Sequence, residues 1–171
     1  MNVMKNIKIE KVTLNIGTGK SQEQLERGLK LLASIAKNKV VKTITQKRIA
    51  AWGLRPGLPI GCKVTLRRND ASDVLKKMIE ARDFLLGANN FDDFGTVSFG
   101  IKEYIDIQGL KYNPDIGTMG LQVCVTLQRP GFRVKCRKIA KKKIPKCHRI
   151  SQSEAVDFMC KNYNVKMRKE E

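Results

Sequence analysis

Acidic residues, aromatic residues and histidine are all scarce in this sequence of 171 residues. Sixteen Asp and Glu stand against 34 Lys and Arg, aromatic side chains make up 6% of the chain, and there is a single His. No apolar run approaches the roughly 18 residues that a membrane-spanning helix requires. Residues 1–11 alternate charged with apolar side chains, which is unlike a secretion signal. We therefore expect neither a membrane-spanning chain nor a secreted one.

The residues that build metal sites and disulfides are equally sparse. The five Cys are an odd number without the spacing of a disulfide framework, which favours free thiols in a reducing compartment. A metal site would have to use Cys136, Cys147, His148 and Cys160, and these contain no C-x-x-C pair. We therefore expect no bound metal and no cofactor.

Catalytic motifs are missing as well. His148 is the only imidazole base, and the adjacent Cys147 cannot easily face it because neighbouring side chains diverge. Residues 17–21, Gly-Thr-Gly-Lys-Ser, are similar to the end of a phosphate-binding loop but have Leu14 where that motif needs glycine. They predict either a tight turn before a capped helix or a phosphate contact at the N-terminus of that helix. No catalytic residue is expected, so the chain is not predicted to be an enzyme.

What the sequence has in excess is positive charge, gathered into two blocks. The net charge is +18, with +12 in residues 1–69, −4 in 70–128 and +10 in 129–150. Such blocks suit a phosphate backbone or an anionic membrane surface better than a small metabolite. For the basic segment (residues 129–150), the sequence leaves open a disordered tail or a dedicated contact surface.

Hydrophobic periodicity predicts an α+β fold in a single domain, residues 1–171. The predicted order is β-α-β-β-α-β-β-α, which favours a mostly antiparallel sheet with helices packed on one face and an open, basic face for RNA. Strands are predicted at 7–16, with an irregularity near Glu10, and at 41–45, 60–66, 97–101 and 121–127.

The helices are predicted from capping residues and helical spacing. The first covers 22–37 and is capped by Ser21 in a capping-box pattern, and the C-terminal helix covers 151–163 behind a full capping box. The middle helix is capped by Asp70 or Ser72 and places Leu85 on its apolar face. Glycine and proline make residues 50–59 an exposed loop.

Two parts of this predicted fold suit RNA. Polar residues of the strands share the open face, namely Thr13, Asn15, Lys63, Thr65 and Arg67. The loop at 47–57 carries Lys47, Arg48, Trp52 and Arg55, and Trp52 either stacks on a base or anchors the loop on its own sheet. No aromatic pair stands on a strand, which favours structured RNA recognised by shape and backbone.

Several specific strings stand along the chain. They are Val-Thr-Leu-Asn-Ile-Gly at 12–17, Pro-Ile-Gly-Cys-Lys-Val-Thr-Leu-Arg at 59–67, Asn-Asn-Phe at 89–91, Phe-Gly-Ile at 99–101, Lys-Tyr-Asn-Pro at 111–114, Arg-Pro-Gly-Phe at 129–132 and His-Arg-Ile-Ser at 148–151. In sequence and in order, these strings resemble the universal large-subunit ribosomal protein L-five family, and the last two resemble its archaeal and eukaryotic form. The resemblance covers nearly the whole chain.

The resemblance implies a structural role at the central protuberance of the large ribosomal subunit. There the family joins 5S rRNA to large-subunit rRNA, and an extended loop approaches tRNA in the P site. Matching positions imply that Asn15, Lys63, Thr65 and Arg67 bind 5S rRNA. The tRNA loop corresponds to Lys47, Arg48, Trp52 and Arg55. Where the family has a Gly-Gln-Lys-Pro type of turn, this chain has Lys-Asn-Lys-Val at 37–40, so a contact of that Gln is absent or made by Asn38.

The resemblance also implies contacts with large-subunit rRNA and with other ribosomal proteins. Large-subunit rRNA is expected to meet the cations of the basic segment through its backbone, and other proteins associated with 5S rRNA are expected neighbours in a cytoplasmic large subunit. The residues concerned are Arg129, Arg133, Lys141, Lys142, Lys143, His148 and Arg149. The alternative function is a free-standing RNA-binding assembly or processing factor that uses the same surface.

Overall fold

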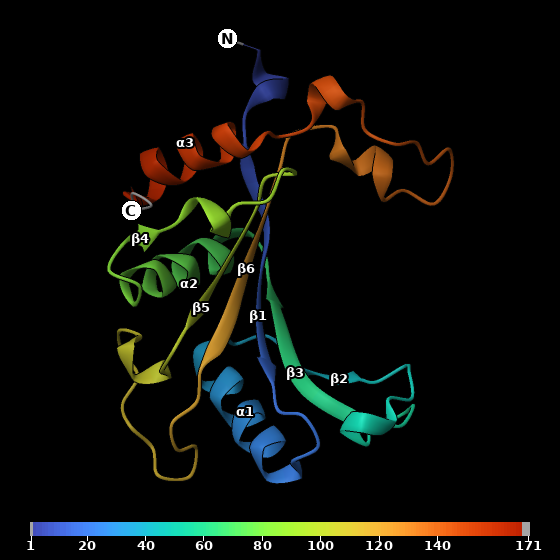
Figure 1. The fold of residues 1–171 in the computed structure, drawn as a ribbon. Helices are drawn as coiled ribbons and strands as arrows, with labels where there is room; N and C mark the ends of the chain where they lie inside the picture. Colours follow the sequence, from blue (N-terminus) through green and yellow to red (C-terminus); the bar gives the residue numbers. More distant parts are fainter. Residues whose placement is uncertain (1, 169–171) are drawn as a thin grey trace.

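An antiparallel sheet forms the centre of the computed structural model, which describes residues 2–168 (Figure 1). Within these residues five strands lie in the order β2-β3-β1-β6-β5. Their bounds are β1 Lys8–Gly17, β2 Val41–Ile44, β3 Pro59–Leu66, β5 Thr96–Ile101 and β6 Leu121–Gln128. The helices are α1 Gln22–Ile35, α2 Arg68–Glu80 and α3 Gln152–Tyr163. The α+β class and the order of these elements are confirmed; the ends of the predicted domain, residues 1 and 169–171, lie outside the described residues.

Strand β1 holds the sheet together because it pairs with both β3 and β6. Its pairing with β6 shifts between Ile9 and Lys11, which confirms the irregularity predicted near Glu10. Beyond this bulge, Val12, Leu14 and Ile16 are buried on one face. The residues between them therefore point to the opposite face, which none of the described helices covers.

Helices α1 and α2 cover the apolar face of the sheet. The buried side chains include Leu25, Leu31 and Leu32 of α1 and Leu75, Met78 and Ile79 of α2. Gly28 allows α1 to approach β3 closely, because a Cβ there would lie 3.0 Å from Cys62 Sγ. Apolar burial of this kind contributes roughly 25 cal/mol for each Å² removed from water, so it holds the helices on one face.

The capping residues at the first and last helices agree with the sequence. Ser21 Oγ accepts a hydrogen bond from the backbone of Gln24, although the side chain of Gln24 does not complete a capping box. Ser151 and Glu154 form both bonds of a capping box at α3. Preceding α1, the backbone N–H groups of Thr18 and Gly19 both donate to Ile60 O, so this segment is a tight turn pinned to β3.

The middle helix differs from its prediction at both ends. It begins after Arg67, which caps without a side-chain bond, so neither Asp70 nor Ser72 is the cap. It ends at Glu80, and left-handed backbone at Asp83 and Phe84 then turns the chain. Leu85 therefore belongs to β4, Leu85–Leu86, which pairs in parallel with β7, Lys166–Met167. The sequence missed this small sheet because two-residue strands have no periodicity to detect.

The buried thiol of Cys62 gives a test of how the strand faces are assigned. Cys62 is fully buried, and burial raises the pKa of its thiol to about 11. Cys62→Ser places a hydroxyl among apolar side chains, so we expect the free energy of unfolding to fall by about 1–3 kcal/mol. Urea denaturation measures this change, with the exposed Cys136→Ser as the matched control. If the two variants unfold at the same urea concentration, Cys62 does not lie on the buried face of the sheet.

Candidate nucleic-acid interface

The open face of the sheet brings together three of the four residues predicted to bind 5S rRNA. Asn15 lies directly opposite Lys63 on β3 and Gln122 on β6, and its Nδ2 donates to Gln122 Oε1 at 3.2 Å. Thr65 lies opposite Thr13, one step along the same face. Lys63 and Thr65 are exposed. Directly paired residues share a face, so these side chains form one polar surface.

The same surface continues onto β6 and β5, which the sequence reasoning did not include. Cys124 and Thr126 of β6 lie opposite Ser98 and Thr96 of β5, and Gln122 lies opposite Gly100. The signal was present in the sequence, because the buried alternation from Leu121 to Leu127 leaves the intervening residues on the other face. The open face is therefore polar, with neutral amides and hydroxyls among cations such as Lys63 of β3 and Lys11 of β1, which lies opposite Thr126.

Arg67, the fourth predicted residue, lies at the end of β3 and shares a carboxylate with the basic segment. Its Nη1 is 3.9 Å from Glu10 Oε1, and Lys135 Nζ is 3.8 Å from Glu10 Oε2. The side chain of Arg67 is still 58% exposed, so its guanidinium faces solvent beside this ion pair. Glu10 thereby joins the end of the open face to the basic segment.

Asn38 lies in the Lys-Asn-Lys-Val segment at 37–40, where this chain differs from the family's usual turn, and its side chain contacts the edge of β3. Its Nδ2 donates to the backbone oxygen of Thr65 at 3.3 Å. Strand β2 pairs with β3 only as far as Lys63, so this carbonyl would otherwise lack a partner on that side. Asn38 thus binds the protein itself through its amide nitrogen.

The β2–β3 loop (residues 45–58) is an ordered extension of the sheet. Backbone bonds from Thr45 to Leu58 and from Gly57 to Thr45 close its base, and Ile49 pairs with Leu54 within it. The predicted cations Lys47, Arg48 and Arg55 are all exposed.

Trp52 is 65% exposed, so the alternative in which it anchors the loop on the sheet is wrong. Leu54, which is 8% exposed, is buried instead. Trp52 is followed by Gly53 in left-handed backbone, where a Cβ would meet Lys20 Nζ at 2.5 Å. The turn therefore favours glycine for its left-handed conformation, whereas the flexible end of Lys20 could move aside.

The basic segment contains two short 3₁₀ turns, Phe132–Lys135 and Lys146–His148, so it has defined structure rather than the form of a disordered tail. The backbone of Lys142 donates to Val134 O, which closes the segment on itself. Of the seven residues predicted to contact the rRNA backbone, five are exposed to solvent. They are Arg133, Lys141, Lys142, Lys143 and Arg149.

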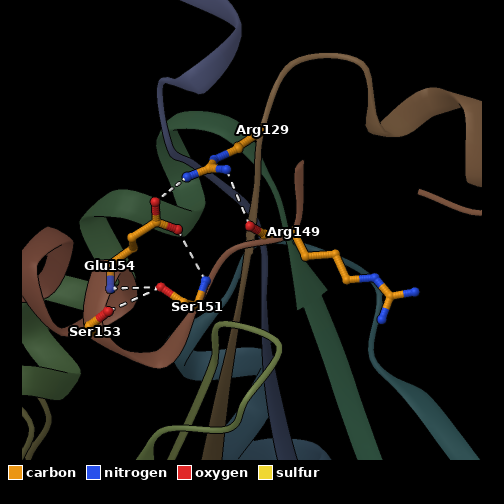
Figure 2. A network of polar contacts seen from close by, with 5 residues as sticks. All are labelled: Arg129, Arg149, Ser151, Ser153 and Glu154. Carbon is orange, nitrogen blue, oxygen red and sulfur yellow. Dashed lines mark hydrogen bonds and ion pairs between the residues drawn. The ribbon is translucent and has the colours of Figure 1, made fainter. Parts of the chain in front are cut away.

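Arg129 corrects the prediction that it contacts the rRNA backbone. It is only 5% exposed; its Nη1 donates to Arg149 O at 3.2 Å, and its Nη2 donates to Glu154 Oε1 (Figure 2). In the same view the side chain of Arg149 points away from this network. Arg129 therefore attaches the basic segment to α3, and the partner 25 residues away could not be identified from local sequence.

His148 is likewise engaged within the chain. Its Nε2 donates to Pro130 O at 2.9 Å, because a carbonyl oxygen can only accept. Its ring meets the ring of Phe132 edge-on, with 5.7 Å between centroids. His148 therefore holds the two ends of the basic segment together, and this ring nitrogen is not free for the predicted phosphate contact.

Glu154 is the carboxylate that neutralises Arg129. Burial by itself would raise the pKa of Glu154, but the backbone N–H of Ser151 and the guanidinium of Arg129 outweigh it, and the pKa lies below its ordinary value. The carboxylate therefore stays charged at neutral pH and serves both the helix cap and the buried guanidinium (Figure 2).

The two basic extensions lie at opposite ends of the open face. Figure 1 shows the β2–β3 loop at the lower right and the basic segment at the upper right, while α1 and α2 lie on the other side of the sheet. Among the described residues, no helix is long and apolar enough to cross a membrane, and no cluster of His, Cys, Asp and Glu could hold a metal ion. This arrangement suits a folded polyanion that contacts the sheet and both extensions.

Comparison with known proteins gives matches over nearly the whole chain. A family model described as Ribosomal protein L5 matches residues 2–55, and a second model, for the C-terminus of the same ribosomal protein family, matches residues 59–167. Large ribosomal subunit protein uL5 of Sulfolobus acidocaldarius is 45% identical over 164 residues, covering 96% of this chain and 92% of the relative. The protein of the same name from Nanoarchaeum equitans is 46% identical over 165 residues, covering 96% and 97%.

Removing the carboxylate of Glu154 tests how the basic segment is attached. In Glu154→Ala, Arg129 keeps its burial but loses its anionic partner, so we expect the free energy of unfolding to fall by about 1–3 kcal/mol. Proteolysis at Lys141, Lys142 and Lys143 should become faster. Because the pKa of Glu154 is lowered on folding, its contribution is present above the ordinary value of 4.5 and is lost as the pH falls.

Denaturation at several pH values and timed trypsin digestion measure these effects. Glu23→Ala is the matched control, since Glu23 is also an acidic residue in the first turn of a helix but is exposed. If Glu23→Ala changes stability and proteolysis as much as Glu154→Ala does, the attachment is not specific to Arg129.

Proposed function

Because the chain belongs to the ribosomal protein L5 family, we propose that it binds 5S rRNA through the open face of its sheet, as a structural component of the large ribosomal subunit. The family consists of ribosomal proteins rather than enzymes, which agrees with the absence of catalytic motifs in the sequence. The proposed location is the cytoplasmic ribosome, with rRNA and other ribosomal proteins as partners.

The observation that carries this proposal is the composition of the open face. Lys63 is held by pairing on both sides of β3, so its ammonium group is presented from a rigid strand. Beside it lie the amides of Asn15 and Gln122 and the hydroxyls of Thr13 and Thr65. Lysine contacts phosphates, whereas amides and hydroxyls can hydrogen-bond the 2′-hydroxyl groups that distinguish RNA from DNA.

The two extensions divide the remaining contacts. The exposed cations of the basic segment are proposed to neutralise the backbone of large-subunit rRNA. The β2–β3 loop projects from the sheet with Trp52 and its cations exposed, so it can reach a ligand that comes and goes, which we propose to be P-site tRNA. Together the three surfaces would join 5S rRNA to the large-subunit rRNA at the central protuberance.

Removing the two cations of β3 should weaken binding to 5S rRNA. In the double variant Lys63→Ala with Arg67→Ala, the removal of each charge-assisted hydrogen bond costs about 1.5–3 kcal/mol if that bond is fully made. A smaller effect is expected from Arg67, because Glu10 lies beside it. Affinity should also depend less steeply on salt: the magnitude of the slope of log affinity against log salt should decrease by about one for each phosphate contact removed. Filter binding at several salt concentrations measures both quantities.

The matched control for this double variant is Lys76→Ala with Lys77→Ala. It removes the same charge from an exposed part of α2, on the covered side of the sheet. If both double variants lose the same affinity, binding depends on net charge and not on the open face. If the wild-type protein dissociates from large ribosomal subunits at high salt, the alternative function, a transient assembly or processing factor, is favoured instead.

Replacing the β2–β3 loop should affect tRNA without affecting 5S rRNA. A short Gly/Ser linker in place of residues 47–57 removes Lys47, Arg48, Trp52 and Arg55 but leaves Lys63 in its strand. We expect 5S rRNA affinity within about twofold of wild type, which is less than about 1 kcal/mol. Dissociation of P-site tRNA from purified ribosomes should become faster. Loss of 5S rRNA binding equal to that of the β3 variant would contradict this division.

A further inference from the structure

A cavity of about 320 Å³ opens where the open face meets the basic segment. Its lining comes from three parts of the chain: the turn before β5, the polar face of β5 and β6, and the basic segment. The residues used below are Phe94, Thr96, Thr126, Phe132, Lys143 and Arg149. Small-molecule sites have volumes of roughly 300–1,000 Å³, and this cavity lies at the lower end of that range. It can therefore enclose one nucleotide but not a duplex.

Two aromatic rings, those of Phe94 and Phe132, line the cavity, and a cationic side chain lies over each ring. Phe94 is 62% exposed, and the guanidinium carbon of Arg149 lies 5.7 Å from its ring centroid. Lys135 Nζ lies 5.0 Å from the ring centroid of Phe132. An exposed phenylalanine is costly to leave in water, and its ring suits a planar base, which can stack on it.

The sheet supplies the polar part of the cavity. Thr96 and Thr126 lie directly opposite each other on β5 and β6, and both line the cavity. A hydroxyl group both donates and accepts, so this pair can bind the edge of a base or the hydroxyls of a ribose. The strands hold the two hydroxyls in fixed positions before any ligand arrives.

The charge around the cavity favours an anion. Within residues 2–168, no acidic side chain lines the cavity, and the ion pairs include neither Lys143 nor Arg149. Asp92 and Asp93 precede Phe94 in the same turn but are not among the lining residues. Lys143 and Arg149 are therefore available to a phosphate group next to the aromatic rings.

We propose that this cavity binds one unpaired nucleotide of the RNA that the protein holds. The base stacks against Phe94, the threonine hydroxyls contact the base edge or ribose, and Lys143 with Arg149 binds the phosphate. This proposal rests on the proposed function for the identity of the polymer as RNA. It adds recognition of a single extruded base to a surface that otherwise contacts RNA backbone.

Titration of the purified full-length chain with adenosine 5′-monophosphate tests the cavity without any ribosomal RNA. Methyl NMR signals of Thr96, Thr126 and Ile150 should shift in a saturable manner. Ribose 5-phosphate, which lacks the base and cannot stack, should bind at least about fivefold more weakly. Equal affinity for the two probes would overturn the proposal, because the cavity would then be a phosphate site alone.

Two variants locate the binding. Phe94→Ala should weaken adenosine monophosphate at least about fivefold and Phe94→Tyr should restore it, because the ring is retained. Tyr112→Ala is the matched control, since it removes another exposed aromatic that does not line the cavity, and it should leave the titration unchanged. An unchanged Phe94→Ala variant, or loss of binding in Tyr112→Ala, would overturn the assignment.

Filter binding of wild-type protein to 5S rRNA separates this proposal from the proposed function. If 5S rRNA binds normally while the nucleotide titration fails, only the cavity proposal is overturned. If the nucleotide binds with the expected dependence on Phe94 while 5S rRNA does not bind, the cavity proposal holds and the choice of 5S rRNA as the partner is wrong.

Discussion

The alternation along β1 is the constraint on which the rest of this structure depends. Val12, Leu14 and Ile16 must face the helices, so Thr13 and Asn15 face the other way. Because β1 pairs with β3 on one side and β6 on the other, its register also sets which of their residues are exposed. A slip of one residue in β3 would turn Lys63 into the core, where an unpaired ammonium group is very costly. The packing of the core therefore maintains the polar surface as well.

The two basic extensions meet a different physical problem, since clustered cations repel one another. The basic segment contains no acidic residue, and the carboxylates that contact its cations come from outside it. Glu10 reaches Lys135 from the bulge of β1, and Glu154 reaches Arg129 from α3. These two contacts neutralise cations at the base of the segment and leave those of its outer part exposed to solvent. Attachment to the protein and affinity for a polyanion are thus assigned to different cations.

The sequence predicted what depends on near neighbours and missed what depends on distant ones. The strand faces, the irregularity near Glu10 and the capping box at Ser151 follow from spacings of a few residues, and all are confirmed. The burial of Arg129 needs a carboxylate on another element, and charge alone gave it the same role as the exposed lysines. Of the candidate site, the cluster on β1 and β3 was predictable, but the cavity was not, because Phe94 and Arg149 meet only through the fold.

The distribution of charge over the open face bears on how RNA would be recognised. Cations of the face, such as Lys63 of β3 and Lys11 of β1, and those of the extensions act over a distance comparable to the Debye length, about 8 Å at physiological salt, so they would attract and orient the polyanion. The neutral amides and hydroxyls between them act only at contact, and they are fixed by strand pairing on both sides. Attraction is thus supplied by groups that do not distinguish RNA from DNA, and discrimination by groups that contribute little at a distance. A face made wholly of lysine would bind more tightly at low salt but would lose this discrimination, which is a physical reason for neutral polar side chains among the cations.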